Sequence, residues 1–185
     1  MTDPIVHERC DACGFDGARY DPASLLEALR GLGPRWRPLL ASAGPELRAR
    51  PEPEVWSAIE YAAHSRDITA LHVYGVEQAL TGEEPVFPPI MANDLIEAAA
   101  ATYDAADPVD VSAELTTQMA RLADLAQAAG SNAWSQGITI GDDRTDVRHL
   151  LEHALHDSLH HVGDVERGLA RLRSENPGGR GLPIS

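Results

Sequence analysis

The sequence predicts an all-α protein, a four-helix bundle with a long crossover between its second and third helices. Hydrophobic residues make up 43% of the 185 residues but aromatic residues only 5%, which suits Ala- and Leu-rich helices better than a β-sandwich. Apolar residues recur at helical spacing in four long segments. The connection between the second and third segments is long, as in bundles that contain a crossover.

The length of the chain is that of one domain with a sizeable core. We expect an N-terminal extension over residues 1–20 and the bundle over residues 21–174. Residues 175–185 are rich in Gly and Pro, so we expect a flexible tail there.

The first two long helices are bounded by proline and glycine. Pro22 follows Asp21 and opens the first helix, because Pro is favoured in the first turn of a helix. This helix is expected to run to about Ala43. The second helix is expected over residues 54–80, with Gly82 just beyond its end, where glycine commonly stops a helix.

The crossover is expected to hold a proline-rich connection and a short helix over residues 93–103. The third long helix is expected to begin after Pro108, with Asp110 or Ser112 as its N-cap. Gly130 marks its end.

A turn-rich segment over residues 131–144 separates the third long helix from the fourth and contains a short β-like piece at residues 138–140. It is expected to form either a rim with Trp134 as a lid over one end of the bundle, or a surface loop with Trp134 packed on the bundle. The fourth long helix is expected over residues 145–174, with Thr145 as its cap.

The formal net charge of −14 argues against a nucleic-acid or anionic-membrane partner, because both require basic patches. No signal peptide is visible, and no apolar run approaches the length that spans a bilayer. Two cysteines do not make a disulfide framework. We therefore expect a soluble, cytoplasmic protein with small-molecule partners, and the sequence leaves open whether it forms a homodimer.

Two segments share a pattern that places titratable side chains on one helix face: an acid, a His four residues later, and an Asp three residues after that. The matching residues are Glu60, His64 and Asp67 in one segment, and Asp157, His161 and Asp164 in the other.

A helical wheel places His64 and His161 among apolar residues, so both imidazoles are expected to point inward. A buried imidazole normally has a hydrogen-bond partner or a metal, because leaving it unpaired is costly. One inward His is usually a satisfied core residue, but two inward His–acid pairs on separate helices favour a metal site. The other histidines of the late segment are expected on a solvated face, and His153, His156 and His160 are candidate substitutes as ligands.

The N-terminal extension contains Cys10 and Cys13 in a Cys-x2-Cys-Gly turn, which is the usual half of a zinc knuckle. His7 is a candidate third ligand of this second site, and Asp16 or a residue of the bundle is a candidate fourth. A redox pair and two plain reduced cysteines are the alternatives.

Trp56, with a Ser after it, and His64 eight residues on are similar to the W-[ST]-x6-H motif of the DinB-like superfamily. The late motif of Asp157, His161 and Asp164 most resembles that of the mycothiol-dependent maleylpyruvate isomerase branch. The resemblance implies a four-helix bundle whose divalent metal, zinc or nickel, is bound by His64, Asp157 and His161. In this family the late pair is more often His and His or Glu and His, so either the metal shifts or a candidate substitute replaces Asp157.

The resemblance also implies a thiol-dependent S-transferase or isomerase, in which the metal activates mycothiol or a similar thiol against an electrophilic substrate. Three protein ligands leave one metal position open, as in catalytic sites. Asp67 and Asp164 would then orient the histidines or bind substrate, and Glu60 would be a fourth ligand or a proton acceptor.

The sequence also allows two other interpretations. The first is a bundle that binds metal for a structural or regulatory purpose without catalysis. The second is a dinuclear carboxylate–histidine site, which ranks last because the third long helix offers only Glu114 and Asp124 as further carboxylates.

Overall fold

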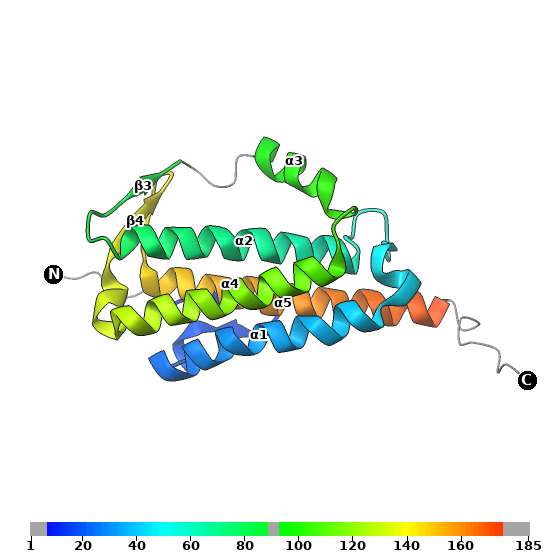
Figure 1. Ribbon diagram of the computed structural model, residues 1–185, viewed down its shortest axis with the longest axis horizontal. Coiled ribbons are helices and arrows are strands. Elements are labelled where there is room, and N and C mark those ends of the chain that lie inside the picture. The colour runs from blue at the N-terminus through cyan, green and yellow to red at the C-terminus, as the bar shows by residue number, and fades with distance from the viewer. Residues whose placement is uncertain (1–6, 89–92, 176–185) are drawn as a thin grey trace, which may run out of the picture.

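The computed structural model describes residues 7–88 and 93–175. Four long helices lie side by side along the molecule (Figure 1), which confirms the predicted four-helix bundle. They are α1 (Pro22–Ser42), α2 (Ala58–Ala79), α4 (Pro108–Ala129) and α5 (Val147–Glu175). The short helix α3 (Asn93–Tyr103) belongs to the crossover between α2 and α4 and packs against α2, as expected.

Both α1 and α2 pack against α4 and α5, so α1 and α2 lie diagonally across the bundle. The core forms where the apolar stripes of the four helices meet, and its largest fully buried side chains include Trp36, Ile59, Met119 and Leu155. The indole Nε1–H of Trp36 donates a hydrogen bond of 2.8 Å to the hydroxyl of Ser158, which ties α1 to α5 inside the core.

Side-chain caps fix where the helices begin. Asp21 caps α1, with Pro22 in its first turn as predicted. Ser57 caps α2, which therefore starts four residues later than expected. The cap of α4 is Asp107 and not Asp110 or Ser112, because the Asp107 carboxylate accepts hydrogen bonds from the backbone N–H groups of the first turn.

A three-stranded sheet closes one end of the bundle, in the order β3 (Val86–Phe87), β4 (Gly137–Ile140) and β5 (Asp143–Asp146). Strand β4 pairs parallel with β3 and antiparallel with β5. Just before β4, Trp134 is buried and its Nε1–H donates to the carbonyl of Ala126 at 3.0 Å. Trp134 is therefore packed on the bundle, and the lid interpretation is wrong.

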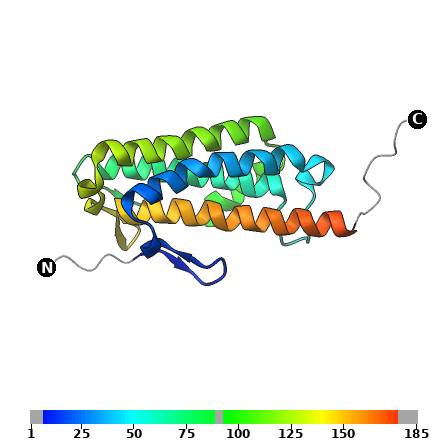
Figure 2. The ribbon, with the colours of Figure 1, turned by 90° about the horizontal axis from the view of Figure 1, so that it is seen from below.

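An N-terminal hairpin, absent from the expected elements, lies along α5 (Figure 2). It pairs β1 (Arg9–Cys10) with β2 (Phe15–Asp16) antiparallel. The ring of Phe15 stacks on His156 with 5.1 Å between centroids. The histidine face of α5 that was expected to be solvated is therefore covered in part by this hairpin.

Among the described residues, none of the helices combines the length and apolar composition that crossing a membrane requires. The tail expected over residues 175–185 falls, beyond Glu175 at the end of α5, outside the described residues.

Candidate metal centre

Helices α2 and α5 bring together His64, Asp157 and His161, a group that we call the bundle site. One ligand atom of each residue lies within 4.8 Å of the other two. The Nε2 atoms of His161 and His64 are 3.4 Å and 3.9 Å from Oδ1 of Asp157. Ligand atoms that share a tetrahedral zinc ion at bond lengths of about 2.0–2.1 Å lie about 3.4 Å apart. The three side chains are therefore spaced to hold one divalent ion.

The ionisation of these side chains also suits a metal. Burial lowers the pKa of His64, which keeps this imidazole neutral. Burial alone would raise the pKa of Asp157, but the hydrogen bond and charge of His161 outweigh it and keep the carboxylate ionised. Burial would likewise lower the pKa of His161, and its two aspartate neighbours outweigh that effect and raise it. His64 and Asp157 are thus in the ionisation states that a metal requires, and at a pH below its raised pKa His161 loses a proton when it joins them.

Asp164 lies one turn beyond His161 on α5 and fixes the orientation of its ring. The Nδ1–H of His161 donates to Oδ2 of Asp164 at 3.0 Å. This hydrogen bond leaves Nε2 as the free ligand atom, the arrangement in which a carboxylate commonly supports a metal-binding histidine. The structure thus brings Asp164 to the side of the site where the sequence pattern expected it.

Aromatic side chains surround the two imidazoles. Trp56 meets His64 edge-on at 5.2 Å, and Tyr61 lies over His161 at 4.9 Å between centroids. Tyr103, at the end of α3, is 6.3 Å from His64. The three ligand side chains nevertheless remain 14–18% exposed, so the site is not sealed from solvent. No local pattern in the sequence marks Tyr103, whose position depends on how the crossover packs on α2.

Asp67 lies near the same wall of aromatic side chains, where its carboxylate accepts a hydrogen bond of 2.7 Å from Nε of Arg66. Burial, together with the charge of Asp67, raises the pKa of Tyr103 to about 12. The side chain of Arg66 is only 25% exposed and also pairs with Glu114 at 3.4 Å. Asp67 therefore acts on Tyr103 and Arg66 more directly than on His64.

Glu60 occupies a different position from the one expected. Its carboxylate completes a capping box at the start of α2, where it accepts hydrogen bonds from the backbone N–H and the hydroxyl of Ser57. Both of its oxygens also accept hydrogen bonds from the guanidinium of Arg50. Burial would raise the pKa of Glu60, but these partners hold it below its ordinary value. Glu60 was expected as a fourth metal ligand or a proton acceptor. Its carboxylate instead caps helix α2, which corrects that expectation.

The residues expected to form the N-terminal site have different partners in the structure. His7 pairs through Nδ1 with Oε1 of Glu152 at 2.8 Å and does not join the cysteines. Cys10 and Cys13 instead group with two histidines of α5, His156 and His160.

His153 groups with Glu8 and His156 on the hairpin side of α5. The candidate substitutes His153, His156 and His160 thus gather beneath the hairpin, and Asp157 keeps its place in the bundle site.

The protein is thus a four-helix bundle in which two imidazoles and one carboxylate lie together between two helices. The chain belongs to the DinB superfamily, whose family model matches residues 28–165. The membership that the sequence motifs suggested is thereby confirmed, while the mycothiol-dependent branch stays a prediction.

A similar solved structure is that of YfiT from Bacillus subtilis, described as a probable metal-dependent hydrolase with an unusual four-helix bundle topology. The TM-score is 0.73 at 16% identity, over 82% of this chain and 87% of the YfiT chain. This likeness shows the shared fold. Among curated proteins, no sequence matches the chain.

Proposed function

We propose that this protein is a divalent-metal-dependent enzyme, with zinc or nickel held by His64, Asp157 and His161. We further propose that it is an S-transferase or isomerase that uses mycothiol or a similar thiol against an electrophilic substrate. The spacing of the three ligand atoms supports the proposed metal site, because three side chains from two helices surround a volume that fits one ion. The sequence resemblance to the thiol-dependent branch supports the second part.

A divalent ion with three protein ligands keeps an open position, where its charge favours the thiolate form of an entering thiol near neutral pH.

The residues of this chain prepare that position. Asp164 holds the ring of His161 so that Nε2 faces Asp157. The rings of Trp56 and Tyr61 lie against the two imidazoles and offer apolar surface to a substrate. With its pKa raised to about 12 by burial and by Asp67, the hydroxyl of Tyr103 stays protonated at neutral pH, so it can donate a hydrogen bond.

Hydrolysis is the second candidate function, because YfiT shares the fold and is described as a probable metal-dependent hydrolase. The same open position would then take water in place of a thiol. A metal-binding bundle without catalysis is the third candidate.

One assay separates the three candidates. The purified protein, loaded with zinc or nickel, is incubated with a chromogenic aryl halide or a chromogenic ester, each with and without a low-molecular-weight thiol. We expect turnover of the halide only when thiol and metal are both present. Thiol-independent hydrolysis of the ester would favour the second candidate, and bound metal without either reaction would favour the third.

A further inference from the structure

We propose that the N-terminal hairpin carries a second metal site, a structural zinc clip formed by Cys10, Cys13, His156 and His160. We call this group the hairpin site. It is separate from the bundle site and does not depend on the function proposed for it.

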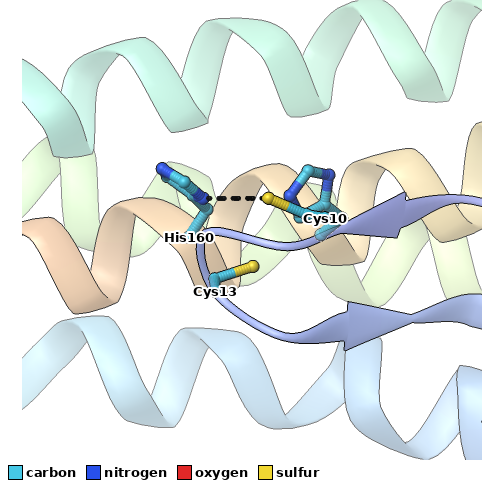
Figure 3. A group of neighbouring side chains, drawn as sticks. Cys10, Cys13 and His160 are labelled. Carbon is cyan, nitrogen blue, oxygen red and sulfur yellow. Dashed lines mark hydrogen bonds between the residues drawn. The ribbon is translucent and has the colours of Figure 1, made fainter.

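The four side chains already lie close together. One ligand atom from each lies within 4.8 Å of every other, and Sγ of Cys10 is 3.8 Å from Nδ1 of His160 (Figure 3). A sulfur and a nitrogen that share a tetrahedral zinc ion lie about 3.6 Å apart, since Zn–S is about 2.3 Å and Zn–N about 2.0–2.1 Å. A small inward movement of the ligands would complete the coordination.

The hairpin turn is shaped to present two sulfurs to one point. Gly14 has a positive φ of 74°, and its N–H donates to the carbonyl of Cys10 at 2.8 Å. Glycine adopts this left-handed conformation without steric cost, and the resulting tight turn brings Cys10 and Cys13 to the same side. Figure 3 shows both thiols at the tip of the hairpin, against α5 and beside His160.

His156 is oriented for a ligand that the described residues do not provide. Its Nδ1 pairs with Oε1 of Glu8 at 2.9 Å, which leaves Nε2 as the ring nitrogen available to a metal. That Nε2 atom is buried and has no hydrogen-bond partner among the described residues. A buried polar atom without a partner costs free energy, and a metal ion would satisfy it. The pairing of Glu8 with His156 is also the arrangement in which a carboxylate supports a metal-binding histidine.

Hydrogen bonds away from the cysteines also hold the hairpin against α5. The backbone N–H of Glu8 donates to Oε2 of Glu152 at 2.9 Å, and His7 pairs with the other oxygen of the same carboxylate. Arg148 donates to the carbonyls of Gly17 and Tyr20 at 3.2 Å and 2.6 Å. These contacts hold the cysteines over α5 before any ion binds, so little chain entropy remains to be lost on coordination.

The ligand set identifies the ion. Two thiolates and two imidazoles at Cys-x2-Cys and His-x3-His spacing are typical of structural zinc sites. With all four positions filled by protein, the site is closed to substrates. Both thiols lose their protons to solvent when the ion binds, and the imidazoles bind as neutral rings.

Cobalt(II) provides the test, because tetrahedral cobalt bound to thiolates has a strong near-ultraviolet charge-transfer band. The full chain is freed of metal, titrated with cobalt(II), and then challenged with zinc. We expect the band to appear with about one equivalent of cobalt in this closed site and to vanish when zinc displaces it. It should be absent from a Cys10→Ser/Cys13→Ser variant and present in a His64→Ala/His161→Ala variant, which removes only the bundle site.

Single variants guard against misfolding of the double cysteine variant. His160→Asn should weaken cobalt binding more than about 100-fold, and Glu8→Gln about 10- to 100-fold. His149→Ala is the matched control, because it lies on the same face of α5 outside the four ligands, and it should keep the band.

Three results would overturn the proposal. One is a band that survives the loss of both cysteines. Another is a band lost in His153→Ala but kept in His160→Asn, which would place His153 and not His160 beside the thiolates. The third is a Cys10–Cys13 disulfide in protein purified under reducing conditions, with no thiolate band at any cobalt concentration.

Discussion

The bundle site and the hairpin site use the same helix in different ways. Each takes two ligands one turn apart on α5, Asp157 and His161 in the first and His156 and His160 in the second. The two pairs are offset by one residue, which turns them about 100° around the helix axis. One pair therefore faces α2 inside the bundle, and the other faces the N-terminal hairpin.

The number and kind of ligands separate the two groups. The bundle site offers two imidazoles and one carboxylate with partial exposure to solvent, whereas the hairpin site offers four ligands, two of them sulfur. An ion with an open position can carry out chemistry, and an ion with four protein ligands holds structure together. The two proposals therefore give a catalytic role to the metal on one side of α5 and a structural role to the metal on the other.

Removing one ligand of the bundle site should have the largest effect and tests the difference between the two sites most directly. His161→Ala should lose the bundle metal and at least about 1000-fold of any metal-dependent activity, since a bound ion supplies several kcal/mol of transition-state stabilisation. His149→Ala should keep both the metal and the activity. Elemental analysis and rate measurements on the two variants check this, and equal metal content in both would contradict the assignment.

Removing the hairpin ligands should act on stability instead. Zinc present at about 1000 times its dissociation constant stabilises a folded protein by about 4 kcal/mol. The Cys10→Ser/Cys13→Ser variant should lose that increment, so zinc should raise its thermal unfolding temperature less than that of wild type, through the bundle site alone. Rates per bundle-bound metal should stay within about twofold of wild type at a temperature where the variant is folded. A variant that unfolds like wild type in the presence and absence of zinc would remove the structural half of the comparison.

Asp164 links the two sites, because its Oδ2 lies 3.0 Å from Nδ1 of His161 and 3.6 Å from Nε2 of His160. Asp164→Asn should weaken metal binding about 10- to 100-fold at both sites, as loss of an orienting carboxylate commonly does. Glu8→Gln should weaken only the hairpin site. Competition titrations of wild type and the two variants against a chelator of known affinity measure the difference. Wild-type affinity at both sites in Asp164→Asn would show that this carboxylate orients neither ligand.

The pH dependence of metal binding should also differ between the sites. Burial opposes protonation of His161, but Asp157 and Asp164 raise its pKa above 6.5, so the metal-free bundle site gives up about one proton on binding. The affinity of the bundle site for its metal should therefore rise about tenfold per pH unit up to the raised pKa of His161 and level off above it. The hairpin site releases about two thiol protons, so near neutral pH its affinity should rise more steeply, by up to about 100-fold per pH unit. Equal slopes at the two sites would contradict this.

The same pKa shift has a stability consequence of opposite sign in the metal-free protein. A raised His161 pKa contributes stability that is fully present below the unfolded value of 6.5 and is lost as pH rises through the folded pKa. Metal-free wild type should accordingly lose slightly more stability than His161→Gln between about pH 6 and pH 8, by about 1 kcal/mol or less once solvent screening is considered. Denaturant unfolding at the two pH values, with chelator present, measures this smallest effect.

Local sequence patterns were enough to predict the helices and the pairing of histidine with acid on α2 and α5. Helical periodicity is a local property, so four-residue spacing is enough to place Asp157 and His161 on one face. The same local reasoning could have found the capping box of Ser57 and Glu60, whose S-x-x-E spacing is a known helix start. The acid–His–Asp pattern alone instead led to the prediction that Glu60 belongs to the metal site.

Which distant residues share a site depends on how the helices and the hairpin pack together. Cys10 and His160 lie 150 positions apart, and no periodic pattern relates a hairpin to a helix across that separation. The Cys-x2-Cys and His-x3-His spacings were each visible, but several histidines of α5 could have matched the cysteines equally well. The docking of the hairpin through Glu152 and Arg148 selected among them, because packing contacts and not local spacing fix the rotation of a strand pair against a helix.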